Sequence, residues 1–191
     1  MNKTGAAFSV RFLRNGDQIT VVRNVIDSAG NGAALFQVVD TTTGTPTPDW
    51  TQTENQPIIQ LGIRSAAGYP TEITNVAWAY DGVTLNFTYN GSNWVTANND
   101  IRFQARINGN YYELKIVANI ASKTVVSNKQ ISYEVSYSSN AHSDTLQGSI
   151  DVLIQQAGSN SHILQITTNR VELDASHNEA ILTAVASYGS T

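Results

Sequence analysis

Apolar and polar residues alternate along most of this chain, and the pattern is clearest on both sides of Asp81-Gly82. Asp-Gly between two alternating runs predicts a two-residue hairpin of type I′, because both central residues of that turn need a positive φ. The turn fixes a register with three apolar pairs, Tyr80 with Val83, Trp78 with Leu85 and Val76 with Phe87. Because every apolar residue of this face meets an apolar partner, we expect the face to lie in a core.

Seven strand-like runs follow one another between residues 57 and 156. They cover residues 58–64, 73–80, 83–89, 101–107, 110–118, 129–138 and 145–155. Short strands separated by turn signals, without a helical period, predict an all-β fold, an immunoglobulin-like antiparallel β-sandwich. A closed barrel is the alternative.

A second turn signal, Asn108-Gly109, predicts another hairpin within this region. Its expected apolar pairs are Ala105 with Tyr112, Phe103 with Leu114 and Ile101 with Ile116. The opposite face of the same hairpin then carries the polar residues Arg102, Gln104, Arg106, Glu113 and Lys115. We expect the apolar face to be buried and the polar face to be in solvent.

Residues 1–56 are expected to form an N-terminal hairpin followed by a docking arm rich in Pro and Thr. Asn15-Gly16 predicts the hairpin, with Phe12 opposite Ile19, and a further strand-like run covers residues 33–39. Two strands alone are marginal in water, so this region needs another surface. Trp50 lies in the arm and either pins it to the neighbouring domain or contacts a partner. The candidate particle-docking residues are Phe8, Val10, Phe12, Phe36 and Trp50.

Residues 157–191 follow a polar joint and read as about three further strands, too few to bury a core of their own. We expect the start of a second β-sandwich here, continuing beyond Thr191. The alternative is that these strands complete a sheet with residues 6–39.

Composition narrows the possible partners. Charged residues make up 14% of the chain and the net charge is −4, so we expect no nucleic acid to bind, because phosphate recognition depends on Lys and Arg. No segment is as long and apolar as a membrane span, and the first residues contain no secretory leader, so we expect no membrane partner and synthesis in the cytoplasm.

Residues with catalytic or metal-binding chemistry are few and scattered. His142-Ser143-Asp144 has the residue types of a hydrolytic triad, but neighbours in one loop cannot point at each other. Asp174, His177 and Glu179 surround one turn without the dense carboxylates of a calcium loop. The chain has no Cys, and no two carboxylates stand out as an acid/base pair. We therefore expect no enzymatic activity, no metal and no cofactor.

One loop, residues 90–100, could contact a ligand. Trp94 could stack on a sugar ring while Asn93, Asn98 and Asp100 hydrogen-bond to its hydroxyl groups. Two other interpretations remain: the indole folds back over the end of the sandwich, or it contacts a partner subunit.

Several of these motifs together resemble a known group of proteins. They are the Asn15-Gly16 hairpin, LFQVVD at 35–40, Pro48-Asp49-Trp50, Gln56-Pro57, W-x-Y-D-G-x-x-L-x-F at 78–87 and the restarting β unit. This combination resembles tandem immunoglobulin-like virion proteins of tailed phages and prophages of gut Bacteroidales.

The resemblance implies a structural protein of the fibre, tail or head-decoration type, located in the virion. Its partners would be other virion proteins and further copies of itself, with a host-surface glycan as a possible ligand. The chain is also similar in style to bacterial surface-adhesion modules, so a carbohydrate-binding or adhesion module at the cell surface is the alternative function.

Overall fold

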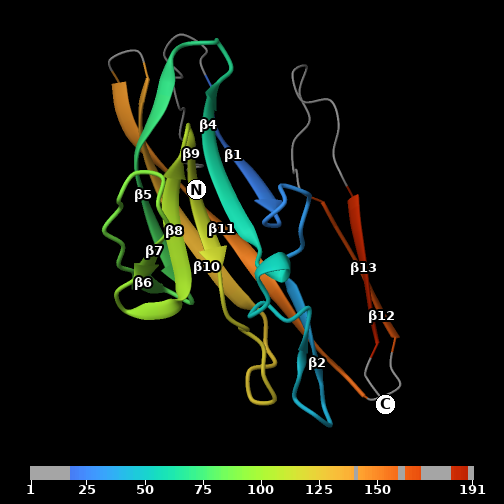
Figure 1. Cartoon of the computed structure of the whole chain (residues 1–191). Coiled ribbons are helices and arrows are strands. Elements are labelled where there is room, and N and C mark those ends of the chain that lie inside the picture. The colour runs from blue at the N-terminus through green and yellow to red at the C-terminus, as the bar shows by residue number, and fades with distance from the viewer. Residues whose placement is uncertain (1–17, 140–141, 159–161, 169–181, 189–191) are drawn as a thin grey trace, which may run out of the picture.

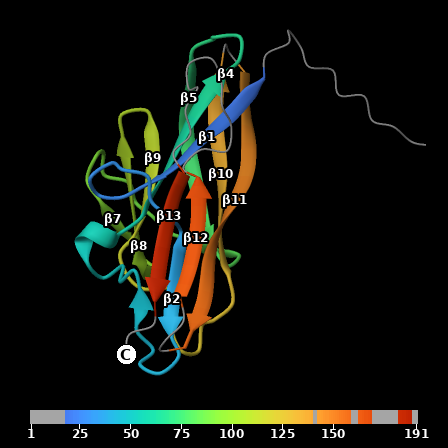
Figure 2. The same cartoon turned by 90° about the vertical axis from the view of Figure 1, so that its right-hand side faces the viewer.

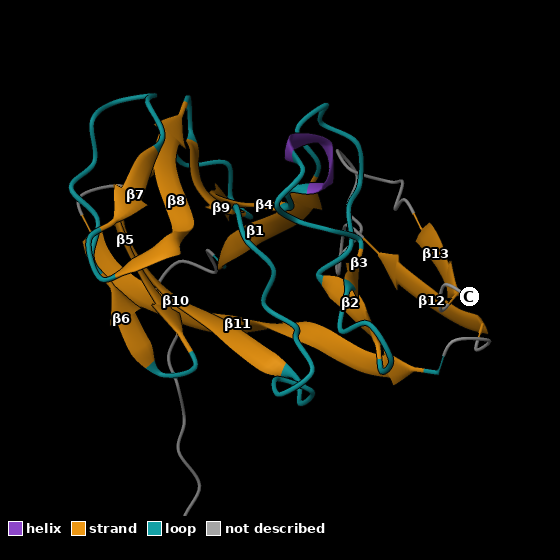
Figure 3. Cartoon of the chain, turned by 60° about the horizontal axis from the view of Figure 1, so that its bottom comes forward, coloured by secondary structure: helices purple, strands orange, loops and turns teal. Residues whose placement is uncertain are grey.

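The computed structural model describes residues 18–139, 142–158, 162–168 and 182–188. Nearly all of its regular structure is β-strand, and two sheets pack face to face as a sandwich, which confirms the expected fold class (Figure 1). Figure 3 shows the two layers, with β5, β10 and β11 in one and β1, β4, β8 and β9 in the other.

Each sheet combines strands from distant parts of the sequence. The five-stranded sheet has the order β1 (Ile19–Ile26), β4 (Ile58–Ser65), β9 (Tyr111–Ile116), β8 (Asp100–Asn108) and β7 (Val95–Ala97). The six-stranded sheet has the order β3 (Pro46–Thr47), β2 (Phe36–Asp40), β11 (His142–Ala157), β10 (Lys129–Ser139), β5 (Thr71–Tyr80) and β6 (Val83–Leu85). A 3-10 turn, η2 (Thr53–Asn55), precedes β4.

The core lies between the two sheets and follows the period-2 alternation of their strands. Trp78 and Ile131 come from the six-stranded sheet, and Leu61, Phe103 and Leu114 from the five-stranded one; all are almost fully buried. Full burial of such side chains contributes about 1.5–3 kcal/mol each, so this layer is the main stabilising element of the fold.

The hairpin at Asp81-Gly82 has the expected register at its turn. Asp81 and Gly82 have φ angles of 47° and 79°, and Trp78 lies opposite Leu85. Because β6 ends at Leu85, the expected pair of Val76 and Phe87 is not formed, although Phe87 still packs against the core. Val83 is 62% exposed, so the prediction of a core position for it was wrong: it borders the turn, beyond the reach of the opposite sheet.

The second hairpin exists, but its register differs from the expected one by two residues. The turn is formed by Gly109 and Asn110, and only Gly109 has a positive φ, 59°. A turn with Gly first is typical of type II′ rather than type I′. Phe103 therefore lies opposite Ile116, and Arg106 lies opposite Glu113. Because the shift is an even number of residues, the paired side chains stay on their expected faces. Ile101 is 79% exposed, so its expected burial was wrong: it lies beyond the part of β8 that pairs with β9.

Residues 19–56 are part of the sandwich, so the boundary expected after residue 56 is not a break between units. β1 pairs along its whole length with β4, and β2 runs parallel to the end of β11. The other half of the expected N-terminal hairpin, up to residue 17, lies outside the described residues.

The arm that leads from β2 to β4 is held by a buried polar network. Gln37 is fully buried; its Nε2 donates to the Pro48 carbonyl oxygen at 2.9 Å and to Asn119 Oδ1 at 2.6 Å. Asn119 Oδ1 also accepts from the Trp50 backbone N–H at 2.8 Å. The network positions Trp50 in the core, so this side chain pins the arm to the sandwich.

The C-terminal part contributes a separate two-stranded sheet. β12 (His162–Thr168) pairs antiparallel with β13 (Leu182–Tyr188), at the right of Figure 1. Neither strand joins the two larger sheets, and the strand expected at residues 171–173 lies outside the described residues.

Candidate functional site

The outer face of the five-stranded sheet carries a buried carboxylate. Glu113 on β9 is 1% exposed although its side chain points away from the core between the sheets. Its carboxylate accepts hydrogen bonds from Arg106 Nε at 2.6 Å, Gln60 Nε2 at 2.6 Å and Asn108 Nδ2 at 3.1 Å. Three donors from β8 and β4 therefore converge on one acid, and each donor is held in a fixed orientation.

Strand register explains this convergence. Gln60 and Arg106 are the two residues directly opposite Glu113, on β4 and β8. Directly opposed side chains on one face have Cβ atoms about 4.5–5.5 Å apart, which is the reach of a hydrogen-bonded Arg–Glu pair. With the register expected from Asn108-Gly109, Arg106 would have faced Tyr111 and the network could not have formed.

Trp94 packs onto the same face beside this network. The Arg106 guanidinium carbon lies 4.3 Å from the centre of the indole, and Lys115 Nζ lies 4.4 Å from it. Both cations belong to the outer face, so they contact the ring from the side of the sheet, as in a double cation–π contact. Burial, followed by the positive charge of Arg106, lowers the pKa of Lys115.

The four expected ligand contacts in residues 90–100 do not form one cluster. Asp100 is paired with Arg102, whose Nη2 donates to its carboxylate at 2.6 Å, and this hydrogen bond lowers the Asp100 pKa. Trp94 stacks instead on Arg106, four residues further along β8, which corresponds to about 13 Å of strand. Asn93 and Asn98 are exposed, and they lie on opposite sides of β7: Asn93 precedes the strand and Asn98 lies in the turn between β7 and β8.

Two of the five expected docking residues are not at the surface. Phe36 and Trp50 are fully buried, Phe36 against Val38 and Ala157, and Trp50 in the main core. Phe8, Val10 and Phe12 lie outside the described residues. The expected contact between the arm and a partner is therefore replaced by a contact between the arm and its own sandwich.

The border of the six-stranded sheet leaves backbone groups unpaired. β10 covers one side of β11 from His142 to Val152, whereas β2 begins to pair on the other side only at Leu153. Figure 2 shows this half of β11 at the right-hand border of the molecule. Arg23 of β1 reaches it, donating from Nη1 to the Ser149 carbonyl oxygen at 2.8 Å.

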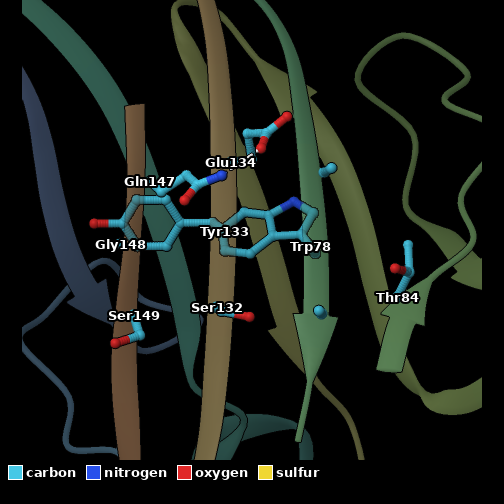
Figure 4. Close-up of a pocket in the computed structure, with 10 residues that line it drawn as sticks. Trp78, Thr84, Ser132, Tyr133, Glu134, Gln147, Gly148 and Ser149 are labelled. Carbon is cyan, nitrogen blue, oxygen red and sulfur yellow. Dashed lines mark hydrogen bonds between the residues drawn. The ribbon is translucent and has the colours of Figure 1, made fainter. Parts of the chain in front are cut away.

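A shallow depression of about 500 Å³ lies over β5, β10 and β11 (Figure 4). Its lining is mostly small or hydroxyl-bearing, as in Ala79, Ser132 and Ser149, and Gln147 Nε2 donates to the Glu134 carboxylate at 2.7 Å. Among its lining residues Glu134 is the only titratable carboxylate, so this depression contains no acid/base pair.

The two residue groups considered above for catalysis and metal binding do not form a site in the described part of the chain. His142, Ser143 and Asp144 are consecutive in β11, so their side chains point to alternate faces. Asp174, His177 and Glu179 lie outside the described residues, and no group of metal-binding side chains occurs within them. No helix in the described part of the chain is long and apolar enough to cross a membrane.

Alternation along the sequence predicts that Arg106, Glu113 and Lys115 share one polar face, but it does not connect them with Trp94 or Gln60. Alternation indicates which face a residue occupies, whereas the partner on the next strand depends on register. Comparisons with models of known protein families, with curated proteins and with solved structures found no match.

Proposed function

We propose that this chain is a non-enzymatic structural protein of a phage virion, of the fibre or decoration type, that docks by strand addition at the free border of β11. The resemblance described above motivates the virion role, and the unpaired border of β11 is the observation that supports the mode of docking. An exposed strand border is a template for pairing with a strand from another chain.

The direction of the backbone groups along β11 identifies the groups that would bind. Leu153 donates to Leu35 on the β2 side and Ser149 accepts from Arg23 there, so odd-numbered residues face this border. Five of these odd-numbered residues lie where β2 does not pair with β11. They are Ser143, Thr145, Gln147, Ser149 and Asp151. Among the described residues only two of their backbone groups have a partner, the Ser149 carbonyl and the Thr145 N–H, which donates to Asp144.

The same strand suits a structural role along its length. β11 has 16 residues and would span about 50 Å at 3.3 Å per residue. It pairs with β10 over one part of its length and with β2 at its end, so it joins the two parts of the six-stranded sheet. The strand donors in this proposal are other virion proteins or further copies of this chain.

A pair of proline substitutions tests the docking mode. Ser149→Pro removes an N–H that faces the free border, and proline is tolerated there because the β10 ladder is untouched. Ile150→Pro removes an N–H that faces β10 and should unfold the sheet. We expect Ser149→Pro to keep the thermal unfolding temperature within a few degrees and to lose incorporation into virions assembled in its presence.

Normal incorporation of a folded Ser149→Pro variant would exclude docking at this border. Deletion of residues 1–17 provides the second arm of the experiment, because it leaves every described strand intact. If that deletion alone prevents incorporation while Ser149→Pro does not, attachment occurs through the N-terminal segment and the proposed docking mode is wrong.

A further inference from the structure

We infer that the cleft beside Tyr111 binds an oligosaccharide, with Tyr111 as the stacking platform and the buried amide of Asn24 as a hydrogen-bonding group. Tyr111 and Asn24 belong to the five-stranded sheet, whereas the proposed docking border belongs to β11 of the six-stranded sheet, so this inference does not depend on the docking mode.

Tyr111 is a flat and accessible aromatic surface. Its ring lies against the backbone of Gly62, where a Cβ would come within 2.9 Å of Tyr111 Cε1. The side chain is nevertheless 38% exposed, so the ring face away from the sheet is open to solvent. An aromatic ring fixed in this way can stack on the apolar face of a pyranose with little loss of conformational entropy.

A hydrogen-bonding group without a partner lies in the same cleft as this platform. The amide oxygen of Asn24, opposite Gln60 on β1, is buried and lacks a partner within the described part of the chain. Native proteins rarely leave buried polar groups unsatisfied, so such a group indicates a missing ligand or water.

The platform and the unpartnered acceptor share one cleft. The cleft has a volume of about 890 Å³, and Asn24, Gly62 and Tyr111 line it together with the charged side chains of Arg64 and Glu72. This volume is in the range typical of ligand sites, where a few polar groups fix the orientation of a ligand on an apolar surface.

The lining of this cleft combines the aromatic ring with amide, hydroxyl and charged groups. They belong to Asn24, Arg64, Thr71, Glu72 and Asn110. An aromatic ring beside such polar groups matches the apolar faces and hydroxyl groups of a sugar chain.

The test uses the full chain on an array of purified oligosaccharides from bacterial capsules and lipopolysaccharides. We expect retention of at least one class, and a reduction of at least tenfold for Tyr111→Ala. The matched control is Tyr69→Ala, because Tyr69 is 39% exposed but does not line this cleft; it should bind as the unmodified protein does. Tyr111→Phe keeps the ring and should also retain the glycan.

The thermal unfolding temperature of each variant shows whether a loss of glycan binding is caused by a loss of folding. Incorporation of Tyr111→Ala into virions separates this inference from the docking proposal, because that variant should still be incorporated. Absence of retention on the whole array, equal retention by Tyr111→Ala and Tyr69→Ala, or binding to a peptide array alone would each overturn the inference.

Discussion

At the scale of single residues, Glu113 is the side chain whose surroundings differ most from what its sequence position indicates. A charged residue on the outer face of a sheet is usually in solvent, yet this carboxylate is buried beneath its three donors. Removal of one partner from a buried ion pair leaves an uncompensated charge, which is more costly than loss of the hydrogen bonds alone.

Glu113→Ala should therefore destabilise the protein by about 3–5 kcal/mol, because it leaves the Arg106 guanidinium without its carboxylate. Urea denaturation followed by tryptophan fluorescence measures the change. Glu134→Ala is the control: Glu134 is exposed and its loss should cost less than about 1 kcal/mol. Equal midpoints for the two variants would contradict a structural role for the buried network.

Asp100 provides a test by pH. The hydrogen bond from the Arg102 side chain lowers the pKa of Asp100, so its ionised form is favoured in the folded protein. The resulting stability is present above the unfolded pKa of about 3.9 and is lost as the pH falls through the lower folded pKa. Asp100→Asn should therefore lower the unfolding temperature at pH 7 but have little effect at pH 2. An equal decrease at both pH values would exclude this linkage.

At the scale of elements, the turn at Asp81-Gly82 tests how backbone conformation fixes a hairpin. Gly82 has a φ of 79° and open space around the position of a Cβ, so Gly82→Ala adds backbone strain without a clash. We expect a cost of about 1 kcal/mol, measured by urea denaturation. Gly148→Ala should cost more, because its Cβ would overlap the Tyr133 ring. A reversed order would contradict this account of the two glycines.

The segment before β4 is an integral part of the sandwich, and deletions should reveal this. Loss of residues 1–56 would remove β1, β2 and the buried Trp50, whereas loss of residues 1–17 removes no described strand. We expect the short deletion to keep the circular dichroism spectrum and cooperative unfolding, and the long deletion to lose both. Trp50→Ala alone should cost about 3–5 kcal/mol. If the variant that lacks residues 1–56 still folds, the segment before β4 is not an integral part of the sandwich.

At the scale of the whole molecule, the sandwich should be independent of the C-terminal hairpin. Within the described parts of the chain, β12 and β13 pair only with each other, and the buried hydrophobic residues whose side chains are described lie between Leu35 and Ala157. A fragment of residues 18–158 should therefore unfold in one transition within a few degrees of the full chain, as measured by calorimetry. A fragment that fails to unfold cooperatively would show that the C-terminal strands contribute to this core.

The sequence by itself determined the longer strands, the faces of most of their residues and the position of the first hairpin turn. These features follow from local rules: period-2 alternation buries one side of a strand, and Asp81-Gly82 supplies two residues with positive φ. The same rules placed Arg106 and Glu113 on one polar face, and they also identified 73–80, 101–107 and 129–138 as strands of the sandwich.

Only the tertiary structure decided which strands lie side by side and in which register. A shift of two residues at Gly109-Asn110 leaves every face unchanged, so alternation cannot detect it, yet it brings Arg106 opposite Glu113. The burial of Trp50 and the convergence of Gln60, Arg106 and Asn108 likewise depend on residues far apart in the chain. Such contacts form only when the whole sandwich closes, because their partners are set by packing between strands and not by the sequence around each residue.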